Sequence, residues 1–282
     1  MNQVKTLSVP GKLFLMGEYG VIEGGTAFVA ALSPSYVFEA DTGTRAHPES
    51  PWGRWSSVRV DLLHGVKPVG AGLGPGFGSS TAELIAGAAF YEGRLPKTQT
   101  LWSEYRERHP SASGADLAAQ LESVHGSGSF FKIDLSGGEL GVFPIDPPHW
   151  VDQVWVFRVA PGNKLKTHED LERPRKPLDF PQFQDLMLRF EAACFNKSQE
   201  GLRIFDEFAD FLHAFDRETE SSHRIRRTLR QVRGVIGVKG CGAGLNDSFL
   251  VARDASAPKK EIMETAEGLG LHFLGSLKEV LA

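Results

Sequence analysis

Short runs of apolar residues, some continuous and some alternating with polar residues, predict β strands in both halves of the chain. These runs lie at residues 13–16, 26–32, 36–40, 58–62, 129–133, 140–143, 154–159, 235–239 and 248–252. Two glycine pairs, Gly24-Gly25 and Gly137-Gly138, each predict a hairpin turn between two of these strands.

Helical periodicity, with apolar residues three and four positions apart, predicts helices between the strands. The predicted helices cover residues 79–91, 102–108, 113–122, 183–194, 205–215, 221–233 and 261–269, and the last of them closes the chain. Pro147-Pro148 is the best candidate for a linker, because proline continues neither a helix nor a central strand. The pattern therefore predicts an α+β protein of two domains, residues 1–150 and 151–282.

The composition is that of a globular protein and argues against several classes of function. The chain has 282 residues, 41% of them hydrophobic and 23% charged, with a formal net charge of -4. That balance argues against a protein that coats nucleic acid, and no apolar stretch is long enough to span a bilayer. Two cysteines make no disulfide framework, and no targeting segment is visible. We expect a cytoplasmic protein with no nucleic-acid or membrane partner, and homodimer formation stays open.

The most informative segment is a glycine-rich loop at residues 72–83 that leads directly into a helix. Ser79 or Ser80 can cap this helix, and the free N–H groups of its first turn favour an anion. A hydroxyl at this point can also bind the Mg²⁺ of a nucleotide. No lysine follows Gly78, so the loop is not a Walker A motif, and it lacks the context of a dinucleotide fingerprint. The alternative is a glycine turn that serves only backbone geometry.

Two charged residues lie beside the apolar run at residues 13–16. Lys12 follows a Pro-Gly turn, where a lysine can neutralise a transferring phosphoryl group. Glu18 follows the run and can orient Lys12 or bind a substrate. For both residues the alternative is a solvated surface position.

Two later segments are also suited to phosphate chemistry. Asp116 lies near the start of the helix predicted at 113–122, either as a favourable helix-terminus carboxylate or as a base for a hydroxyl. The loop at residues 239–247 either turns a bulged hairpin or presents successive backbone N–H groups to a phosphate. No histidine or cysteine spacing is typical of a zinc site.

Together, these segments resemble the motifs of the GHMP kinase superfamily, which includes galactose, homoserine, mevalonate and phosphomevalonate kinases. The resembling segments are Pro10-Gly11-Lys12, Gly17-Glu18-Tyr19, residues 74–80, Ser113-Gly114-Ala115-Asp116 and Gly242-Ala243-Gly244. Because they occur in the family's order, the resemblance covers nearly the whole chain. It implies the GHMP kinase fold, with an N-terminal ATP-binding domain like domain 2 of ribosomal protein S5. It also implies a C-terminal α+β domain of the ferredoxin-like type, with ATP and acceptor bound in the cleft between the domains.

The resemblance further implies a role for each matching residue. Lys12 would stabilise charge on the transferred group, and Asp116 would accept the acceptor's proton or pair with Lys12. The phosphates of ATP would contact Gly74, Gly76, Gly78, Ser79 and Ser80, with the Ser80 hydroxyl on Mg²⁺. The acceptor would contact Glu18, Tyr19, Thr167, Gly242, Ala243 and Gly244. Family members often add a glutamate to the Mg²⁺ site, and Glu107 is taken for that ligand, with Glu104 as the alternative.

The acceptor is predicted only to a class. Tyr19 and Asp247 resemble phosphomevalonate kinases, the modest length resembles short mevalonate kinases, and the sugar-binding pattern of galactokinases is absent. Where mevalonate kinases continue the third motif with glycines, this chain has Leu245-Asn246-Asp247, which predicts a stiffer loop. Lys164 and Lys166 could supply cations for an anionic acceptor, whereas the arginines of 221–233 are interpreted mainly as a solvated face.

We therefore expect ATP- and Mg²⁺-dependent phosphoryl transfer to a small molecule of the mevalonate pathway, either mevalonate or 5-phosphomevalonate. Two alternatives stay open. One is a non-catalytic binding or regulatory protein on the same fold, and the other is an enzyme like diphosphomevalonate decarboxylase.

Overall fold

The computed structural model describes residues 6–41, 47–48, 50–57, 65–69, 73, 76–160, 175–196, 198–242 and 245–282. The chain forms two compact units. Unit 1 comprises Met1–Leu13, Val29–Ile145 and Ala282, and unit 2 comprises Phe14–Phe28 and Asp146–Leu281. The sequence predicts a division after residue 150, and unit 2 additionally takes in the segment at residues 14–28.

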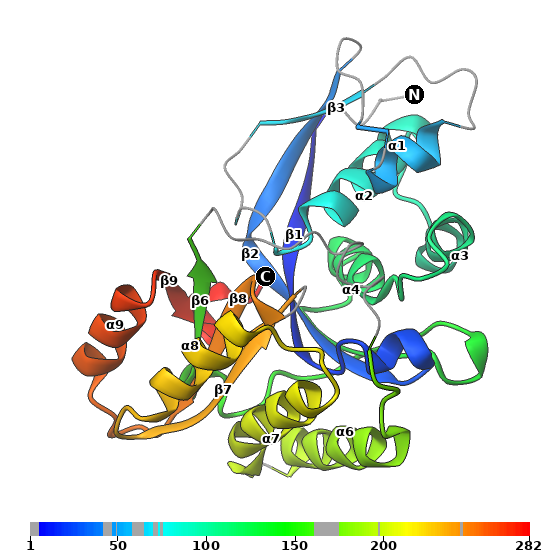
Figure 1. Cartoon of the computed structure of the whole chain (residues 1–282). Coiled ribbons are helices and arrows are strands. Elements are labelled where there is room, and N and C mark those ends of the chain that lie inside the picture. The colour runs from blue at the N-terminus through cyan, green and yellow to red at the C-terminus, as the bar shows by residue number, and fades with distance from the viewer. Residues whose placement is uncertain are drawn as a thin grey trace. The chain divides into compact units, whose positions relative to one another are not determined.

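Unit 1 is built on a sheet of five strands (Figure 1). The strand order is β1 (Thr6–Met16), β2 (Thr26–Asp41), β4 (Phe130–Asp134) and β5 (Gly141–Pro144), and β3 (Gly65–Pro68) pairs with β2. The unit's α-helices are α1 (Pro51–Ser56), α2 (Ser79–Glu92), α3 (Thr98–Arg108) and α4 (Ala115–Val124), and a 3-10 turn, η2 (Ser136–Gly138), joins β4 to β5. The antiparallel pairing of β4 with β5 confirms the predicted hairpin around Gly137-Gly138.

Helix α1 is not among the helices that the sequence predicts. The helix is short, and it is set up by local chemistry: Pro51 occupies its first turn, and the Ser50 side chain accepts a hydrogen bond of 3.0 Å from Gly53 N–H. Its two tryptophans, Trp52 and Trp55, are buried and stacked with ring centroids 5.2 Å apart. Tertiary burial, rather than helical periodicity, therefore stabilises this element.

Unit 2 contains a four-stranded antiparallel sheet in the order β7 (Val235–Cys241), β8 (Ser248–Arg253), β6 (Val154–Val159) and β9 (Leu271–Ser276). Its α-helices are α6 (Phe180–Phe195), α7 (Glu200–Ala214), α8 (Glu220–Arg230), α9 (Lys259–Gly268) and α10 (Leu277–Val280), and its 3-10 turns are η1 (Gly20–Glu23) and η3 (Val151–Gln153). Helices α7 and α8 pack against β7, and α6 packs against α7 (Figure 1).

Large aromatic side chains fill much of the core of unit 2, and they explain the glycines at its N-terminal segment. Phe183 is fully buried, and a side chain at Gly20 or Gly25 would collide with its ring. The predicted turn at Gly24-Gly25 lies between β1 and β2, which are hydrogen-bonded neighbours in the sheet, and the connection contains the 3-10 turn η1, which Gly24 ends with a left-handed backbone at φ 87°.

Two further predictions differ from the structure, and a third falls on residues that the structure does not describe. Residues 26–32 and 36–40 belong to one continuous strand, β2, so Pro34 does not interrupt it. The strand predicted at 58–62 lies outside the described residues. The chain does not close on the helix α9, because β9 and α10 follow it. None of the described helices has both the length and the low polarity that a bilayer crossing requires.

Candidate functional site

The N-terminus of α2 in unit 1 has the geometry of an anion site. Gly78 is the N-cap residue with φ 84°, a left-handed conformation that glycine adopts without steric cost, and it offers no side chain to cap the helix. Ser79 and Ser80 open the first turn, and Ser80 is exposed. The first N–H groups of a helix have no partner within the helix, and the helix dipole adds positive potential there.

Lys12 lies against this N-terminus. Its backbone N–H donates a hydrogen bond of 2.8 Å to the Phe77 carbonyl. A Cβ atom added at Gly78 would lie 2.7 Å from Lys12 Cγ, closer than real contacts allow. Glycine at position 78 therefore serves two purposes, because it permits the left-handed backbone and leaves room for the Lys12 stem.

A buried amide that the sequence did not indicate joins these segments to α4. The amide of Gln120 is fully buried, and its Nε2 donates to the carbonyls of Pro10 at 2.7 Å and Gly78 at 3.1 Å. Its Oε1 accepts a hydrogen bond of 2.5 Å from the Thr81 hydroxyl. We call Pro10, Gly78, Thr81 and Gln120 the amide network. It connects the strand that contains Lys12, the start of α2 and the middle of α4.

Asp116 lies one turn before Gln120 on α4, so the two side chains share a face of the helix. Its Oδ1 accepts a hydrogen bond of 3.0 Å from Leu117 N–H. Within the described part of the chain Asp116 forms no ion pair, so the alternative in which it pairs with Lys12 is not seen. Burial, and after it the charge of Asp116, raises the pKa of Tyr105 above its usual range. Asp116 thus lies near Tyr105 of α3 and one turn of α4 from the amide network.

The remaining predictions for the nucleotide and Mg²⁺ site have mixed outcomes. Gly76 has a left-handed backbone at φ 99°, whereas Gly74 lies outside the described residues. Glu107 is 79% exposed and lies 4.0 Å from Arg108, and among the described residues no hydrogen bond or ion pair joins it to Ser80. Its alternative, Glu104, accepts a hydrogen bond of 2.6 Å from the Trp55 indole, which indicates a structural role.

In unit 2, Glu18 belongs to a buried ion pair rather than to a solvated surface. Its carboxylate pairs with Lys239, whose side chain is fully buried. Lys239 Nζ also donates to the carbonyls of Phe14 at 3.3 Å and Gly240 at 3.0 Å, and lies 3.3 Å from Cys241 Sγ. Burial lowers the pKa of Lys239, but the Cys241 sulfur and the Glu18 carboxylate outweigh it and leave the pKa raised. Lys239 is therefore a cation that fixes Glu18.

Tyr19 has a strained backbone beside this pair. Its φ of 65° is unusual for an aromatic residue, and its side chain is buried. The guanidinium carbons of Arg175 and Arg217 lie 4.8 Å and 5.8 Å from the centre of its ring. Burial, and after it the charge of Arg175, lowers the pKa of Arg217. Strain of this kind, held by surrounding contacts, occurs often at binding sites.

The loop after β7 shows how the chain accommodates its departure from the glycine-rich motif. Gly242 has φ 85°, and a Cβ there would lie 2.6 Å from the Cβ of Asp247. Leu245 also takes a left-handed backbone, at φ 57°, and its buried position is held by a hydrogen bond of 2.5 Å from the Ser222 hydroxyl to its carbonyl. Leu245 thus adopts a left-handed backbone conformation that glycine usually supplies. Ala243, Gly244, Thr167, Lys164 and Lys166 lie outside the described residues.

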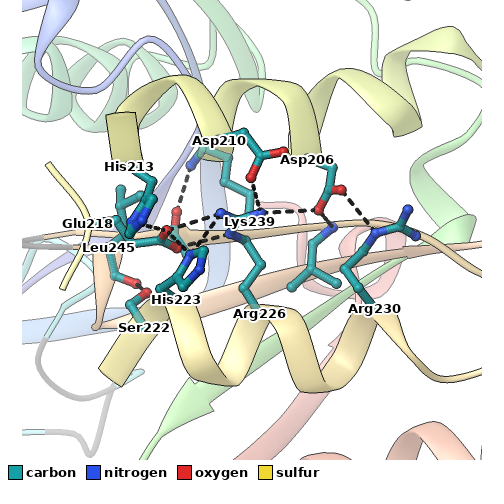
Figure 2. Close-up of polar contacts among 12 residues, drawn as sticks. Asp206, Asp210, His213, Glu218, Ser222, His223, Arg226, Arg230, Lys239 and Leu245 are labelled. Carbon is teal, nitrogen blue, oxygen red and sulfur yellow. Dashed lines mark hydrogen bonds and ion pairs between the residues drawn. The ribbon is translucent and has the colours of Figure 1, made fainter. Parts of the chain in front are cut away.

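A second polar cluster, between α7 and α8, was not indicated by sequence spacing (Figure 2). His213 Nδ1 and His223 Nδ1 lie 3.3 Å and 3.0 Å from one oxygen of the buried Glu218. Arg226, assigned from the sequence to a solvated face, is 3% exposed and donates to both Glu218 oxygens. Burial lowers the pKa of Arg226, and the hydrogen bonds and charge of Glu218, with Asp210, raise it above its usual value.

The atoms of His213, Glu218 and His223 are close enough to hold a metal ion, but two features oppose it. A metal bound by both imidazoles must lie in both ring planes, whereas these rings are stacked 3.9 Å apart at an angle of 12°. The cationic Arg226 also lies 3.2 Å from His223 Nδ1. The cluster is better described as a buried ion-pair network than as a metal centre.

Comparison with solved structures identifies the fold. The phosphomevalonate kinase of Streptococcus pneumoniae matches with a TM-score of 0.73 and 14% identity over 97% of this chain and 98% of that chain. Its complex with phosphomevalonate and AMPPNP gives a TM-score of 0.71. The L. major mevalonate kinase in complex with R-mevalonate has a TM-score of 0.66 and 16% identity over 96% of this chain and 95% of that chain.

A galactokinase matches as well. The Lactococcus lactis enzyme, complexed with galactose, gives a TM-score of 0.67 and 11% identity over 99% of this chain and 93% of that chain. No protein-family model and no curated protein sequence matches. The α+β fold predicted from the motifs is therefore confirmed, and it is shared by kinases with different acceptors.

Proposed function

We propose that the protein is an ATP- and Mg²⁺-dependent kinase that phosphorylates a small molecule of the mevalonate pathway, either mevalonate or 5-phosphomevalonate. One observation carries the proposal. Three motifs far apart in the sequence meet in unit 1, where Lys12, the open N-terminus of α2 and the Asp116 end of α4 are joined by the amide network. The fold that unit 1 belongs to is shared with phosphomevalonate and mevalonate kinases.

The corner of unit 1 offers what phosphoryl transfer requires, which is mainly positioning and positive charge. The first-turn N–H groups of α2 would bind phosphate oxygens, with no side chain at Gly78 in the way. The Lys12 ammonium would stabilise charge that develops on the transferred group. No covalent intermediate with the chain is needed.

The residues also fit Mg²⁺, which prefers hard oxygen ligands. The exposed Ser80 hydroxyl and the half-buried Glu83 carboxylate lie three residues apart on α2, so they share one side of the helix. Burial raises the pKa of Glu83, and a bound divalent cation would oppose that shift. When bound, Mg²⁺ would neutralise phosphate charge. Glu107 stays a predicted ligand on α3.

The chemical step needs few further groups from the chain. An acceptor oxygen bonds to the γ-phosphorus while the bond from that phosphorus to the bridging oxygen breaks and ADP leaves. If the acceptor is the hydroxyl of mevalonate, its proton passes to the Asp116 carboxylate. If the acceptor is the phosphate of 5-phosphomevalonate, it is already ionised and Asp116 has a lesser task.

We assign acceptor contacts to unit 2, to Glu18, Tyr19 and Gly242, with Thr167, Ala243 and Gly244 as further candidates. In support, Glu18 is held as a charged group by Lys239, and Tyr19 has a strained backbone and lies near two arginines. Two arginines near Tyr19 suit an anionic acceptor, and mevalonate and 5-phosphomevalonate are both anions.

The test is ADP release from MgATP with mevalonate in one reaction and 5-phosphomevalonate in another, alongside calorimetry of MgADP binding. Turnover with one acceptor supports the proposal and identifies that acceptor. Nucleotide binding without turnover on either would favour the non-catalytic or the decarboxylase alternative. Absence of nucleotide binding would overturn the assignment of the α2 N-terminus.

A further inference from the structure

We propose that Gln120 is the positioning residue of the nucleotide site, the group that sets the spacing between Lys12 and the N-terminus of α2. The inference rests on the proposed function, and it assigns a role to a residue that belongs to none of the motifs. Gln120 does not touch the ligand in this role. It acts through Lys12 and Gly78.

The orientation of the Gln120 amide follows from its partners. Nε2 faces two carbonyl oxygens, those of Pro10 and Gly78, and neither can donate a hydrogen bond. Oε1 faces the Thr81 hydroxyl, which can donate. Reversing the amide would set its oxygen against the two carbonyl oxygens, so these two hydrogen bonds specify the orientation, and the Thr81 hydroxyl is compatible with it.

The contacts connect parts of the chain that are otherwise distant. Gln120 and Pro10 are 110 residues apart, and Gln120 and Gly78 are 42 residues apart. Pro10 precedes Lys12 by two residues on β1, and Gly78 is the N-cap of α2. A Cβ at Gly78 would lie 3.0 Å from Gln120 Nε2 and 2.7 Å from Lys12 Cγ, so the three residues are in direct packing contact.

A neutral amide suits this position better than a charged side chain. Gln120 is fully buried, and a lone buried charge carries a large desolvation penalty. A carboxylate here would accept from Thr81 but would face the carbonyls of Pro10 and Gly78 without a donor. It would also bring negative charge to the helix end that receives phosphate. A leucine would satisfy none of the three partners.

The experiment compares nucleotide binding by the full-length wild type, Gln120→Leu and Gln120→Glu, with MgADP titrated by calorimetry. We expect Gln120→Leu to raise the dissociation constant about 10- to 100-fold, because small displacements of positioning groups have effects of this size. Gln120→Glu should bind more weakly still near neutral pH. As pH falls and the carboxyl is protonated, it regains a donor, so its affinity relative to wild type at the same pH should recover.

The matched control is Thr98→Val. Thr98 on α3 is also buried, and its hydroxyl donates a hydrogen bond of 2.6 Å to Glu122 on α4, the helix that contains Gln120; among the described residues no hydrogen bond joins Thr98 to the amide network. We expect Thr98→Val to lose stability comparably and to keep the wild-type affinity. Thermal melts of all variants separate loss of folding from loss of binding, and Gln120→Glu keeps the side-chain volume if Gln120→Leu unfolds.

The outcomes separate the inference from the proposed function. Wild type that does not bind MgADP overturns both. Wild type that binds, with folded Gln120 variants of unchanged affinity, overturns only the role of Gln120. A loss of affinity equal to that of Thr98→Val, with no recovery of Gln120→Glu at lower pH, would reduce Gln120 to a general stabilising contact.

Discussion

The amide network of unit 1 and the Glu18–Lys239 pair of unit 2 do the same structural task with different chemistry. Each fastens an N-terminal strand segment to a distant element, over 110 residues for Gln120 and Pro10 and over 221 residues for Lys239 and Glu18. The Gln120 and Lys239 side chains are both fully buried. The first link is neutral, and the second is an ion pair.

The difference shows that the buried link of unit 1 carries no charge, whereas that of unit 2 contains two opposite charges. A neutral link adds no fixed charge beside the α2 N-terminus, so the fields of that helix end and of Lys12 stay available to a phosphate. An ion pair costs desolvation, and removing one partner leaves a buried charge. Glu18 is therefore already paired with Lys239, and in the acceptor role proposed above it would offer a carboxylate that is held in place.

The largest expected effect is on kcat, for a substitution at Asp116, one turn of α4 from Gln120 of the neutral link. Asp116→Asn should lower kcat about 10²- to 10⁴-fold with a hydroxyl acceptor, because a general base is lost. It should leave stability and MgADP affinity nearly unchanged, since Asp116 forms no ion pair among the described residues. With a phosphate acceptor the loss should be much smaller. Steady-state kinetics with both acceptors checks this, and unchanged kcat with mevalonate removes Asp116 from the mechanism.

The charged link should be the more sensitive of the two to loss of one partner. Lys239→Met should destabilise the fold by about 3–5 kcal/mol, because Glu18 is left buried without its cation. The double variant Glu18→Gln, Lys239→Met should regain most of that loss. Urea unfolding measures the loss of stability. The control is Lys260→Met, which removes the exposed ion pair between Lys260 and Glu264 and is expected to change stability little. A single variant as stable as the double would contradict the comparison.

Two glycines, one at each end of α2, allow a comparison that tests the role of the neutral link. Gly78 and Gly93 have φ of 84° and 68°, so alanine at either should cost about 1–2 kcal/mol of strain. At Gly78 the new Cβ meets Lys12 and Gln120, whereas no atom of the described residues lies within 4 Å of a Cβ at Gly93. We expect Gly78→Ala to lose MgADP binding and Gly93→Ala to keep it. Equal affinities by calorimetry would show that the loop serves geometry alone.

The smallest expected effect is on stability, for a substitution at Glu83 of α2, whose pKa is raised. Burial raises the pKa of Glu83 from 4.5, so its contribution to stability is present below about pH 4.5 and is lost as pH rises through the folded value. Glu83→Gln should therefore be more stable near neutral pH, by no more than about 1 kcal/mol. Urea unfolding at several pH values should show the two proteins converging in acid. A variant less stable than wild type at neutral pH would contradict the expectation.

Much of the fold follows from local patterns, and the sequence identified them. The apolar run at 154–159 is the strand β6, and the helix expected at 79–91 is α2, which extends to Glu92. Helix α2 has a glycine at each boundary, Gly78 and Gly93, and β6 is a continuous apolar run, and both signals act over a few residues. The strand β9 escaped prediction because its buried and exposed residues neither alternate nor form one apolar run, and the helix α1 because it has only six residues and depends on packing.

The sequence by itself determined which residue types suit phosphate chemistry, namely Lys12, the glycines and serines before α2, and Asp116. Tertiary structure alone decided which polar side chains are buried and what they bind. In the sequence, Gln120 is a polar residue in a helix, Lys239 a strand lysine and Arg226 part of a charged face, yet all three are buried with specific partners. Whether a polar side chain is solvated or buried depends on contacts between segments tens to hundreds of residues apart. Periodicity and spacing report only on near neighbours, so that information appears only when the chain is folded.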